Sequence, residues 1–130
     1  MEKVTTSNAP CPGGHYSQAI AHNVLVFVSG QLPIDPATGE KIFGSIEAQT
    51  NQVLKNVAAI LKAAGSSLDR VLKTTVYVSD IQLWARVNGI YAKFFGDHRP
   101  GRAVFPTNSL HHGFLIEIEA IAALNETEEN

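Results

Sequence analysis

The sequence predicts an α+β domain in which two helices cover one face of a mixed β-sheet. Two stretches carry apolar residues at helical spacing, and period-two or continuous apolar runs lie before, between and after them. The expected order is therefore strand, strand, helix, strand, helix, strand, strand. At 130 residues, 45% of them hydrophobic, the chain has the size and composition of one domain with a real core, spanning residues 1–130.

The N-terminal part is expected to hold an arm and the first two strands. Residues 1–14 contain few apolar side chains and two prolines, which indicates an irregular arm or a short edge strand. Tyr16–Ile20 begins the sheet, and Val24–Val28 is a continuous apolar run typical of a strand covered on both faces. The run ends at Ser29 and Gly30, where the glycine permits a bulge or the close approach of a ligand.

Two amphipathic stretches predict the helices. Ser45 is the candidate N-cap of the first, and Gly65 ends it. Asp80 is the candidate cap of the second, and Gly96 ends it. The apolar stripe of the second helix is formed by Trp84, Val87, Tyr91, Phe94 and Phe95.

The remaining strands are expected at Val71–Ser79, Ala103–Asn108 and Phe114–Leu124, followed by an acidic tail at 125–130. In the first of these, the alternation puts Leu72 on one face together with Thr74, Val76 and Val78. Two helices cover only one face of such a sheet. Because apolar residues also lie on the other face, the sequence predicts an oligomer.

Composition and charge exclude several classes of function. A net charge of −2 without a run of Lys or Arg argues against nucleic acid as the main partner. The single cysteine, Cys11, excludes an intrachain disulfide and is interpreted as an incidental thiol. No segment resembles a signal peptide or a membrane span, so we expect a cytoplasmic protein, with an organellar form left open.

Unlike charges occur within apolar, strand-like sequence only between Pro100 and Leu124. Arg102 follows a Pro-Gly corner, while Glu117 and Glu119 alternate with apolar residues and share one strand face. Two interpretations are open from the spacing. Arg102 either neutralises an acid in an antiparallel hairpin, or binds a substrate carboxylate beside a glutamate that orients water.

Five blocks of the sequence carry a resemblance to a known family. The chain resembles the RidA subgroup of the Rid family of reactive-intermediate deaminases. The blocks are GHYSQA (Gly14–Ala19), VSGQLPIDPATGE (Val28–Glu40), the helix and strand within Gln49–Asp80, VNGIYAKFF (Val87–Phe95) and GRAVFPTNSLHHGFLIEIEAIA (Gly101–Ala122). The resemblance implies a chorismate-mutase-like fold, a homotrimer with clefts between subunits, and the hydrolysis of small enamines and imines such as 2-aminoacrylate to 2-keto acids and ammonia, without a cofactor.

The resemblance also implies roles for individual residues. Arg102 would hold the substrate carboxylate through two parallel charge-assisted bonds, and Glu117 would aim the attacking water. The pocket would be completed by Tyr16, Ser29, Gly30 and Asn88. No metal is expected, because the adjacent His111 and His112 would point apart on an extended strand and no acid stands at ligand spacing. A solvated loop is the better interpretation of this segment.

The sequence departs from the commonest family pattern around this site, at His15, Ala103, Val104 and His111. Arg102 and Glu117 are kept, so the changes leave carboxylate binding intact and put the preferred imine in question. Two alternatives remain beside the deaminase. One is an endoribonuclease that inhibits translation, and the other is a non-enzymatic binder of small carboxylates or a holdase.

Overall fold

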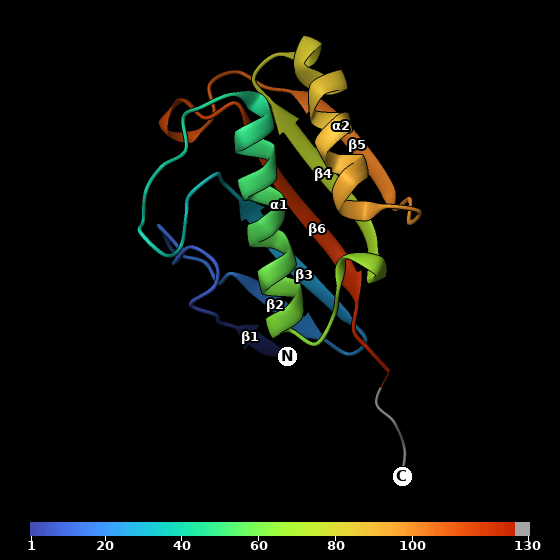
Figure 1. Ribbon diagram of the computed structural model, residues 1–130. Helices are drawn as coiled ribbons and strands as arrows, with labels where there is room; N and C mark the ends of the chain where they lie inside the picture. The colour runs from blue at the N-terminus through green and yellow to red at the C-terminus, as the bar shows by residue number, and fades with distance from the viewer. Residues whose placement is uncertain (127–130) are drawn as a thin grey trace.

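A computed structural model describes residues 1–126 as a six-stranded sheet with two helices packed on one face (Figure 1). The strands are β1 (Glu2–Val4), β2 (Ala19–His22), β3 (Leu25–Gln31), β4 (Val71–Val78), β5 (Gly101–Pro106) and β6 (Ile116–Ala123), and the helices are α1 (Ile46–Ala63) and α2 (Trp84–Phe95). The spatial order is β1-β2-β3-β6-β4-β5. Only β4 and β5 pair in parallel, so the predicted mixed α+β sheet is confirmed.

The helix ends follow the signals in the sequence. The Ser45 side chain accepts a hydrogen bond from the Ala48 N–H at 3.1 Å and begins α1, and Gly65 lies just beyond its end with φ of 82°. Gly96 ends α2 with φ of 60°. Asp80 caps a short 3₁₀ turn, Ile81–Leu83, that leads into α2. Trp84 does not belong to the buried stripe, since it is 46% exposed.

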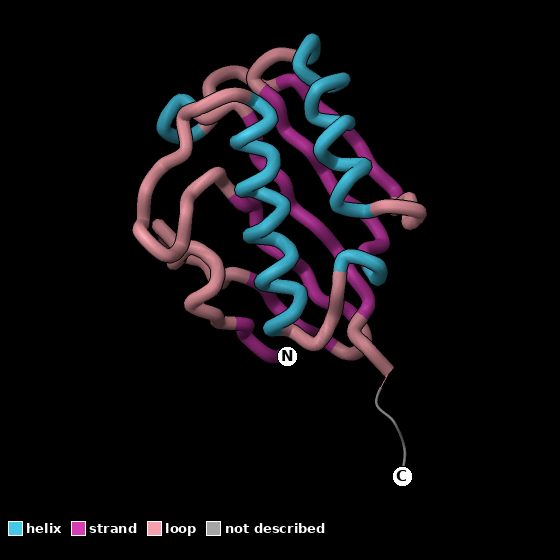
Figure 2. Tube along the Cα trace, viewed as in Figure 1, coloured by secondary structure: helices cyan, strands magenta, loops and turns pink. Residues whose placement is uncertain are grey.

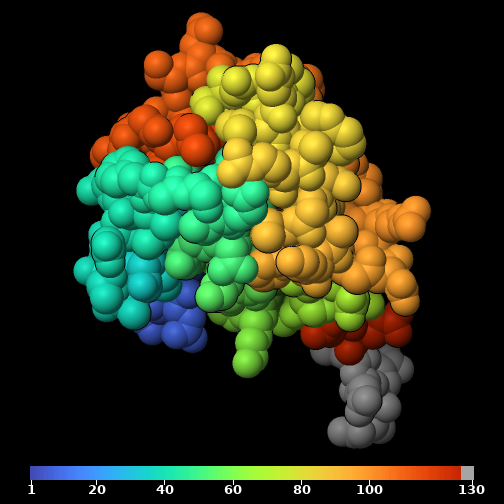
Figure 3. Space-filling view, turned by 45° about the horizontal axis from the view of Figure 1, so that its top comes forward, coloured from blue at the N-terminus to red at the C-terminus, as the bar shows by residue number. Residues whose placement is uncertain are grey.

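The core lies between the helices and one face of the sheet. Figure 2 shows both helices in front of that face, and Figure 3 shows the green atoms of α1 and the yellow atoms of α2 on the surface of this side. Along β6, buried Ile116, Ile118, Ala120 and Ala122 alternate with partly exposed residues that point to the other face. No helix in residues 1–126 covers that other face, which we call the open face. It exposes 43% of Phe27 and 51% of Phe105.

Three expectations about the strands are wrong in detail. The sheet residues of β2 begin at Ala19, because Tyr16 belongs to the loop before it. The register of β4 against β6 shifts between Val71 and Lys73, so Val71 is buried and Leu72 is 52% exposed, the reverse of the expectation. The hairpin of Arg102 with the acidic strand is absent, because β4 lies between β5 and β6.

The N-terminal arm is partly regular. The expected N-terminal arm contains the short edge strand β1, which pairs with β2. Most of the expected acidic tail, at 127–130, lies outside the described residues. None of the helices within residues 1–126 has the length and apolar character needed to cross a bilayer.

Candidate active site

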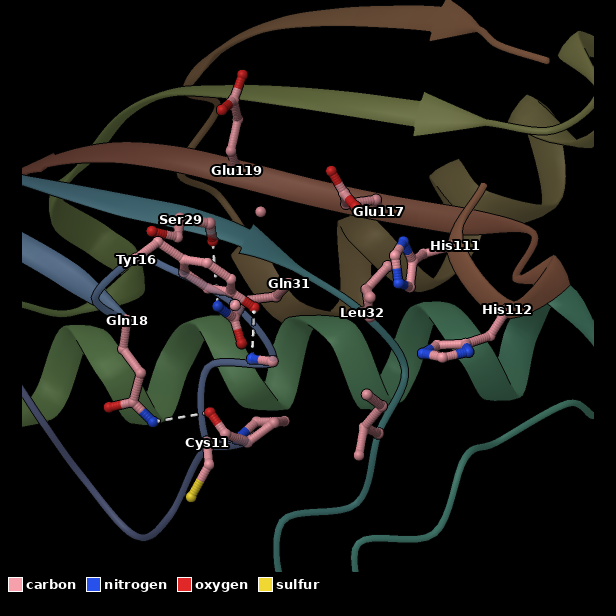
Figure 4. Close-up of a pocket in the computed structure, with 15 residues that line it drawn as sticks. Cys11, Tyr16, Gln18, Ser29, Gln31, Leu32, His111, His112, Glu117 and Glu119 are labelled. Atoms are coloured by element: carbon pink, nitrogen blue, oxygen red, sulfur yellow. Dashed lines mark hydrogen bonds between the residues drawn. The ribbon is translucent and has the colours of Figure 1, made fainter. Parts of the chain in front are cut away.

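A cavity of about 690 Å³ lies where the N-terminal arm, the end of β3, the loop after β5 and β6 meet (Figure 4). Four of the predicted site residues line it: Tyr16, Ser29, Gly30 and Glu117. These residues belong to segments far apart in the sequence. The pairing of β3 with β6 brings Ser29 and Gly30 close to Glu117. The cavity is therefore a candidate active site formed around Glu117.

Glu117 is the central acid of this cavity. It lies opposite Tyr77 of β4 in the sheet register, so its side chain points to the open face. Burial raises the pKa of the Glu117 carboxyl above its ordinary value, the neighbouring Glu119 raises it further, and His111 acts in the opposite direction. Within the described part of the chain, no group donates a hydrogen bond to this carboxylate, which leaves it available to a water or a ligand.

Glu119 lies two residues further along the same face and is held differently. Its Oε1 accepts a hydrogen bond from the Tyr77 hydroxyl at 2.8 Å. This bond is the main reason why the pKa of Tyr77 is raised. Glu119 also lines the cavity, but its carboxylate already has a partner, so Glu117 is the better candidate for chemistry.

The floor of the cavity is an irregularity in β3. The register against β6 shifts between Val28 and Gln31, so Ser29 and Gly30 form a bulge. The Ser29 hydroxyl donates to the Ser17 carbonyl at 2.6 Å, and the Ser29 N–H donates to the Gln18 carbonyl at 3.0 Å. These bonds hold the bulge against the loop before β2. The Ser29 hydroxyl is thus used structurally, and the bulge presents mainly its backbone to the cavity.

Tyr16 lies at the open side of the cavity, 52% exposed. Its hydroxyl oxygen accepts a hydrogen bond from the Gly13 N–H at 3.1 Å, which leaves the hydroxyl hydrogen free to donate to a ligand. Figure 4 shows its ring among the residues that line the cavity. The sequence prediction that Tyr16, Ser29 and Gly30 surround one pocket with Glu117 is consistent with this arrangement.

Arg102 and Asn88 do not line the cavity of Glu117. Arg102 Nη1 donates to Asn88 Oδ1 at 2.9 Å, and the guanidinium lies 4.7 Å from the centroid of the Tyr91 ring. Arg102 pairs with Thr74, whose hydroxyl is hydrogen-bonded to the Tyr91 hydroxyl at 2.7 Å, so Arg102 lies on the helix side of the sheet. Arg102, Asn88 and Tyr91 line a second cavity of about 560 Å³.

Arg102 and Glu117 therefore do not meet within one chain. They belong to opposite faces of the sheet, with β4 between their strands. Each occupies its own cavity. The chain thus carries two separate candidate sites. We call the 690 Å³ cavity of Glu117 the glutamate half-site, and Arg102 with Asn88 and Tyr91 the arginine half-site.

The histidine pair lies in a loop, as expected, but its side chains do not point apart. His111 and His112 belong to a 3₁₀ turn, His111–Gly113, and not to an extended strand. Their ring centroids lie 4.5 Å apart with the ring planes at 85°, so the side chains contact each other instead of pointing apart. Both line the cavity of Glu117. His111 was expected around the site, whereas His112 was missed although Gly113 signalled a turn. Among residues 1–126, no group of three potential metal ligands is present.

Residues 6–124 match the family model described as Endoribonuclease L-PSP. The chain belongs to this family. It is 43% identical to a rat protein named 2-iminobutanoate/2-iminopropanoate deaminase, over 92% of this chain and 87% of that protein. It is 46% identical to Reactive Intermediate Deaminase A, chloroplastic, of Arabidopsis thaliana, over 95% of this chain and 66% of that protein. The Rid resemblance is thus confirmed.

The fold is confirmed in the same way. The crystal structure of a putative endoribonuclease from Thermotoga maritima matches this fold with a TM-score of 0.93 and 46% identity, and the match covers 97% of this chain and 99% of that one. The names of the relatives include both deaminase and endoribonuclease.

Proposed function

We propose that the protein hydrolyses reactive 2-aminoacrylate-type enamines and imines to 2-keto acids and ammonia. The observation that carries this proposal is the Glu117 carboxylate, half-buried in a 690 Å³ cavity with a raised pKa and no hydrogen-bond donor among residues 1–126. Such a group accepts a proton from water more readily than an ordinary carboxylate. The names of the rat and Arabidopsis relatives support the same activity.

The reaction requires one water molecule and no redox step. The water oxygen bonds to the imine carbon while a water proton passes to the Glu117 carboxylate and the C=N π electrons move to nitrogen. The resulting tetrahedral carbinolamine then breaks its C–N bond. Glu117 returns its proton to the nitrogen, which becomes an amino group, and then takes the proton of the carbinolamine hydroxyl and passes it to that nitrogen as the C–N bond breaks. Ammonia leaves, and the oxygen becomes the carbonyl of the 2-keto acid.

Substrate binding needs the arginine half-site. A 2-imino acid carries a carboxylate, and the planar guanidinium of Arg102 matches it with two parallel hydrogen bonds. Asn88 orients the guanidinium from one edge and Tyr91 from one face. Because the two half-sites lie on opposite faces of one sheet, we infer that Arg102 of one copy completes the Glu117 cavity of another.

A homotrimer closed through the open face is the assembly that we propose. The face has no helical cover in residues 1–126, and it exposes large side chains of Phe27, Leu72 and Phe105. Each copy in a cyclic trimer gives its arginine half-site to one neighbour and receives one from the other, so three equivalent clefts result. Sedimentation equilibrium that shows a stable monomer at micromolar concentration contradicts this assembly.

The endoribonuclease alternative is favoured by the family description and by the name of the Thermotoga protein. The cavity argues against it, because Glu117 and Glu119 place two carboxylates where a phosphate backbone would have to approach. A carboxylate binder without turnover uses the same residues as the deaminase. Only kinetics separates these two.

The test is a coupled assay in which a pyridoxal-phosphate dehydratase generates the imine from serine or threonine. Keto-acid release is timed with and without this protein, and single-stranded RNA is incubated with the same preparation. We expect faster keto-acid release and intact RNA. Unchanged keto-acid release contradicts the deaminase. In that case, binding of pyruvate indicates a carboxylate binder, and cleavage of the RNA indicates an endoribonuclease.

A further inference from the structure

Gly30 lies directly beneath the Glu117 side chain. A Cβ built on Gly30 would lie 2.6 Å from Glu117 Oε2, 3.0 Å from its Cδ and 3.3 Å from its Cγ. Carbon and oxygen atoms in ordinary contact are separated by about 3.5 Å or more. The Glu117 side chain therefore occupies the space that a side chain at position 30 would need.

The backbone at Gly30 is fixed from the other side. The bulge places it against β6, and the Ser29 N–H and hydroxyl are both bonded to the loop before β2. The Gln31 side chain adds a bond to the Ser29 carbonyl at 3.1 Å. A Cβ at position 30 would thus displace the Glu117 side chain and not the strand.

We propose that Gly30 is a positioning residue for the reaction, because the absence of a side chain at this position leaves the space in which the Glu117 carboxylate lies. The proposal rests on the proposed function for its catalytic consequence. The contact itself is independent of that function. The carboxylate has no hydrogen bond from residues 1–126, so packing against Gly30 is what restricts its rotamers on this side.

The Gly30→Ala variant tests the catalytic consequence. An added Cβ forces Glu117 into another rotamer, and a displacement of about 1 Å lowers turnover by on the order of 10- to 100-fold. Substrate affinity, which depends on Arg102, changes less, so the effect falls on kcat more than on KM. The matched control is Gly44→Ala, whose Cβ would meet only the Ala48 Cβ at an ordinary 3.7 Å and which we expect to leave activity unchanged.

A double-mutant cycle on thermal stability tests the contact without any activity. Glu117→Ala removes all three atoms that a Cβ at position 30 would meet. We expect the Tm change caused by Gly30→Ala to be about 2–6 °C less favourable when Glu117 is present than in the Glu117→Ala background, where replacing a glycine alone slightly raises stability. Each variant is compared at equal oligomeric state.

The outcomes separate this inference from the proposed function. Reduced kcat in Gly30→Ala, together with a loss of Tm that requires Glu117, supports the positioning role of Gly30. Unchanged kcat, or a Tm effect that is the same in both backgrounds, overturns it. If the parent protein shows no deaminase activity, the proposed function fails. The double-mutant cycle on Tm alone then decides whether Gly30 positions the Glu117 carboxylate.

Discussion

The two half-sites of this chain are constructed in opposite ways. In the arginine half-site, the guanidinium is held by a hydrogen bond from its Nη1 to Asn88 and by the face of the Tyr91 ring. In the glutamate half-site, the Glu117 carboxylate accepts no hydrogen bond from residues 1–126 and rests against Gly30. One group is pre-oriented by polar partners, whereas the other is kept free of them.

The difference fits the two tasks that we propose. A group that binds a carboxylate gains from a fixed orientation, since less freedom is lost when the substrate binds. A group that accepts a proton gains from a raised pKa, which hydrogen bonds to the carboxylate would lower. The contrast teaches that the arginine half-site is suited to binding and the glutamate half-site to proton transfer. The following predictions test this division.

The largest effect is expected for Glu117→Gln. The amide keeps the shape of the side chain but accepts no proton, so kcat should fall by about 10²- to 10⁴-fold with a smaller change in the binding of a small carboxylate. Steady-state kinetics and calorimetry with pyruvate measure the two quantities. Glu119→Gln is the matched control, because that carboxylate is bonded to Tyr77. Equal losses in both variants would remove the distinction between the two acids.

The next effect is expected for Arg102→Lys. Lysine retains the charge but loses the two-pronged geometry, so activity should fall by about 10- to 1000-fold, corresponding to about 1.5–4 kcal/mol. The variant should remain folded in a melting curve. Arg86→Lys is the control, since Arg86 pairs with Glu47 at 2.6 Å on the helix surface, away from both cavities. Pyruvate binding as tight as in the parent contradicts the role of Arg102.

A smaller effect is expected for Asn88→Ala. The variant removes the acceptor of the 2.9 Å bond from Arg102, so the guanidinium loses orientation but not charge. A lost hydrogen bond to a charged group of about 1.4 kcal/mol corresponds to roughly tenfold weaker substrate binding. The loss should appear in KM and in pyruvate affinity. A change confined to kcat would indicate a role of Asn88 in proton transfer. It would contradict the assignment of the arginine half-site to substrate binding.

The smallest effect is a displacement of the pH profile. Because the pKa of Glu117 is raised, kcat should fall on the acid side at a pH above the ordinary carboxylate range, as the carboxylate becomes protonated. Glu119 contributes to the raised pKa, so Glu119→Gln should move this acid limb to lower pH. The kcat profiles of the two proteins between about pH 4 and 8 measure the displacement. A limb that does not move would show that Glu119 exerts no influence on the group that titrates.

Local signals in the sequence predicted much of this structure. Ser45, Gly65 and Gly96 mark helix ends by capping chemistry, which depends only on neighbouring residues. The period-two pattern also put Glu117 and Glu119 correctly on one face of β6. These features could be predicted because each is decided within a few residues of the chain.

The relation of Arg102 to Glu117 could not be predicted in the same way. Alternation shows which residues of one strand share a face, but not which strand lies beside it, and here β4 separates the two. Positions with unusual backbone were also missed. His112 has φ of 56°, which a non-glycine residue seldom adopts, and its ring packs against Phe114 with centroids 5.8 Å apart. The order of the strands depends on pairing between residues far apart in the sequence, so it is decided by the tertiary fold.

The most direct test of the central claim is to mix two inactive variants, Arg102→Ala and Glu117→Gln. If each cleft combines Arg102 of one copy with Glu117 of the next, co-expression in equal amounts regenerates both native residues in about a quarter of the clefts. We predict about a quarter of the parental activity in the purified mixed oligomer, against little activity in either variant alone. Activity no higher than the average of the two variants would contradict a site shared between copies.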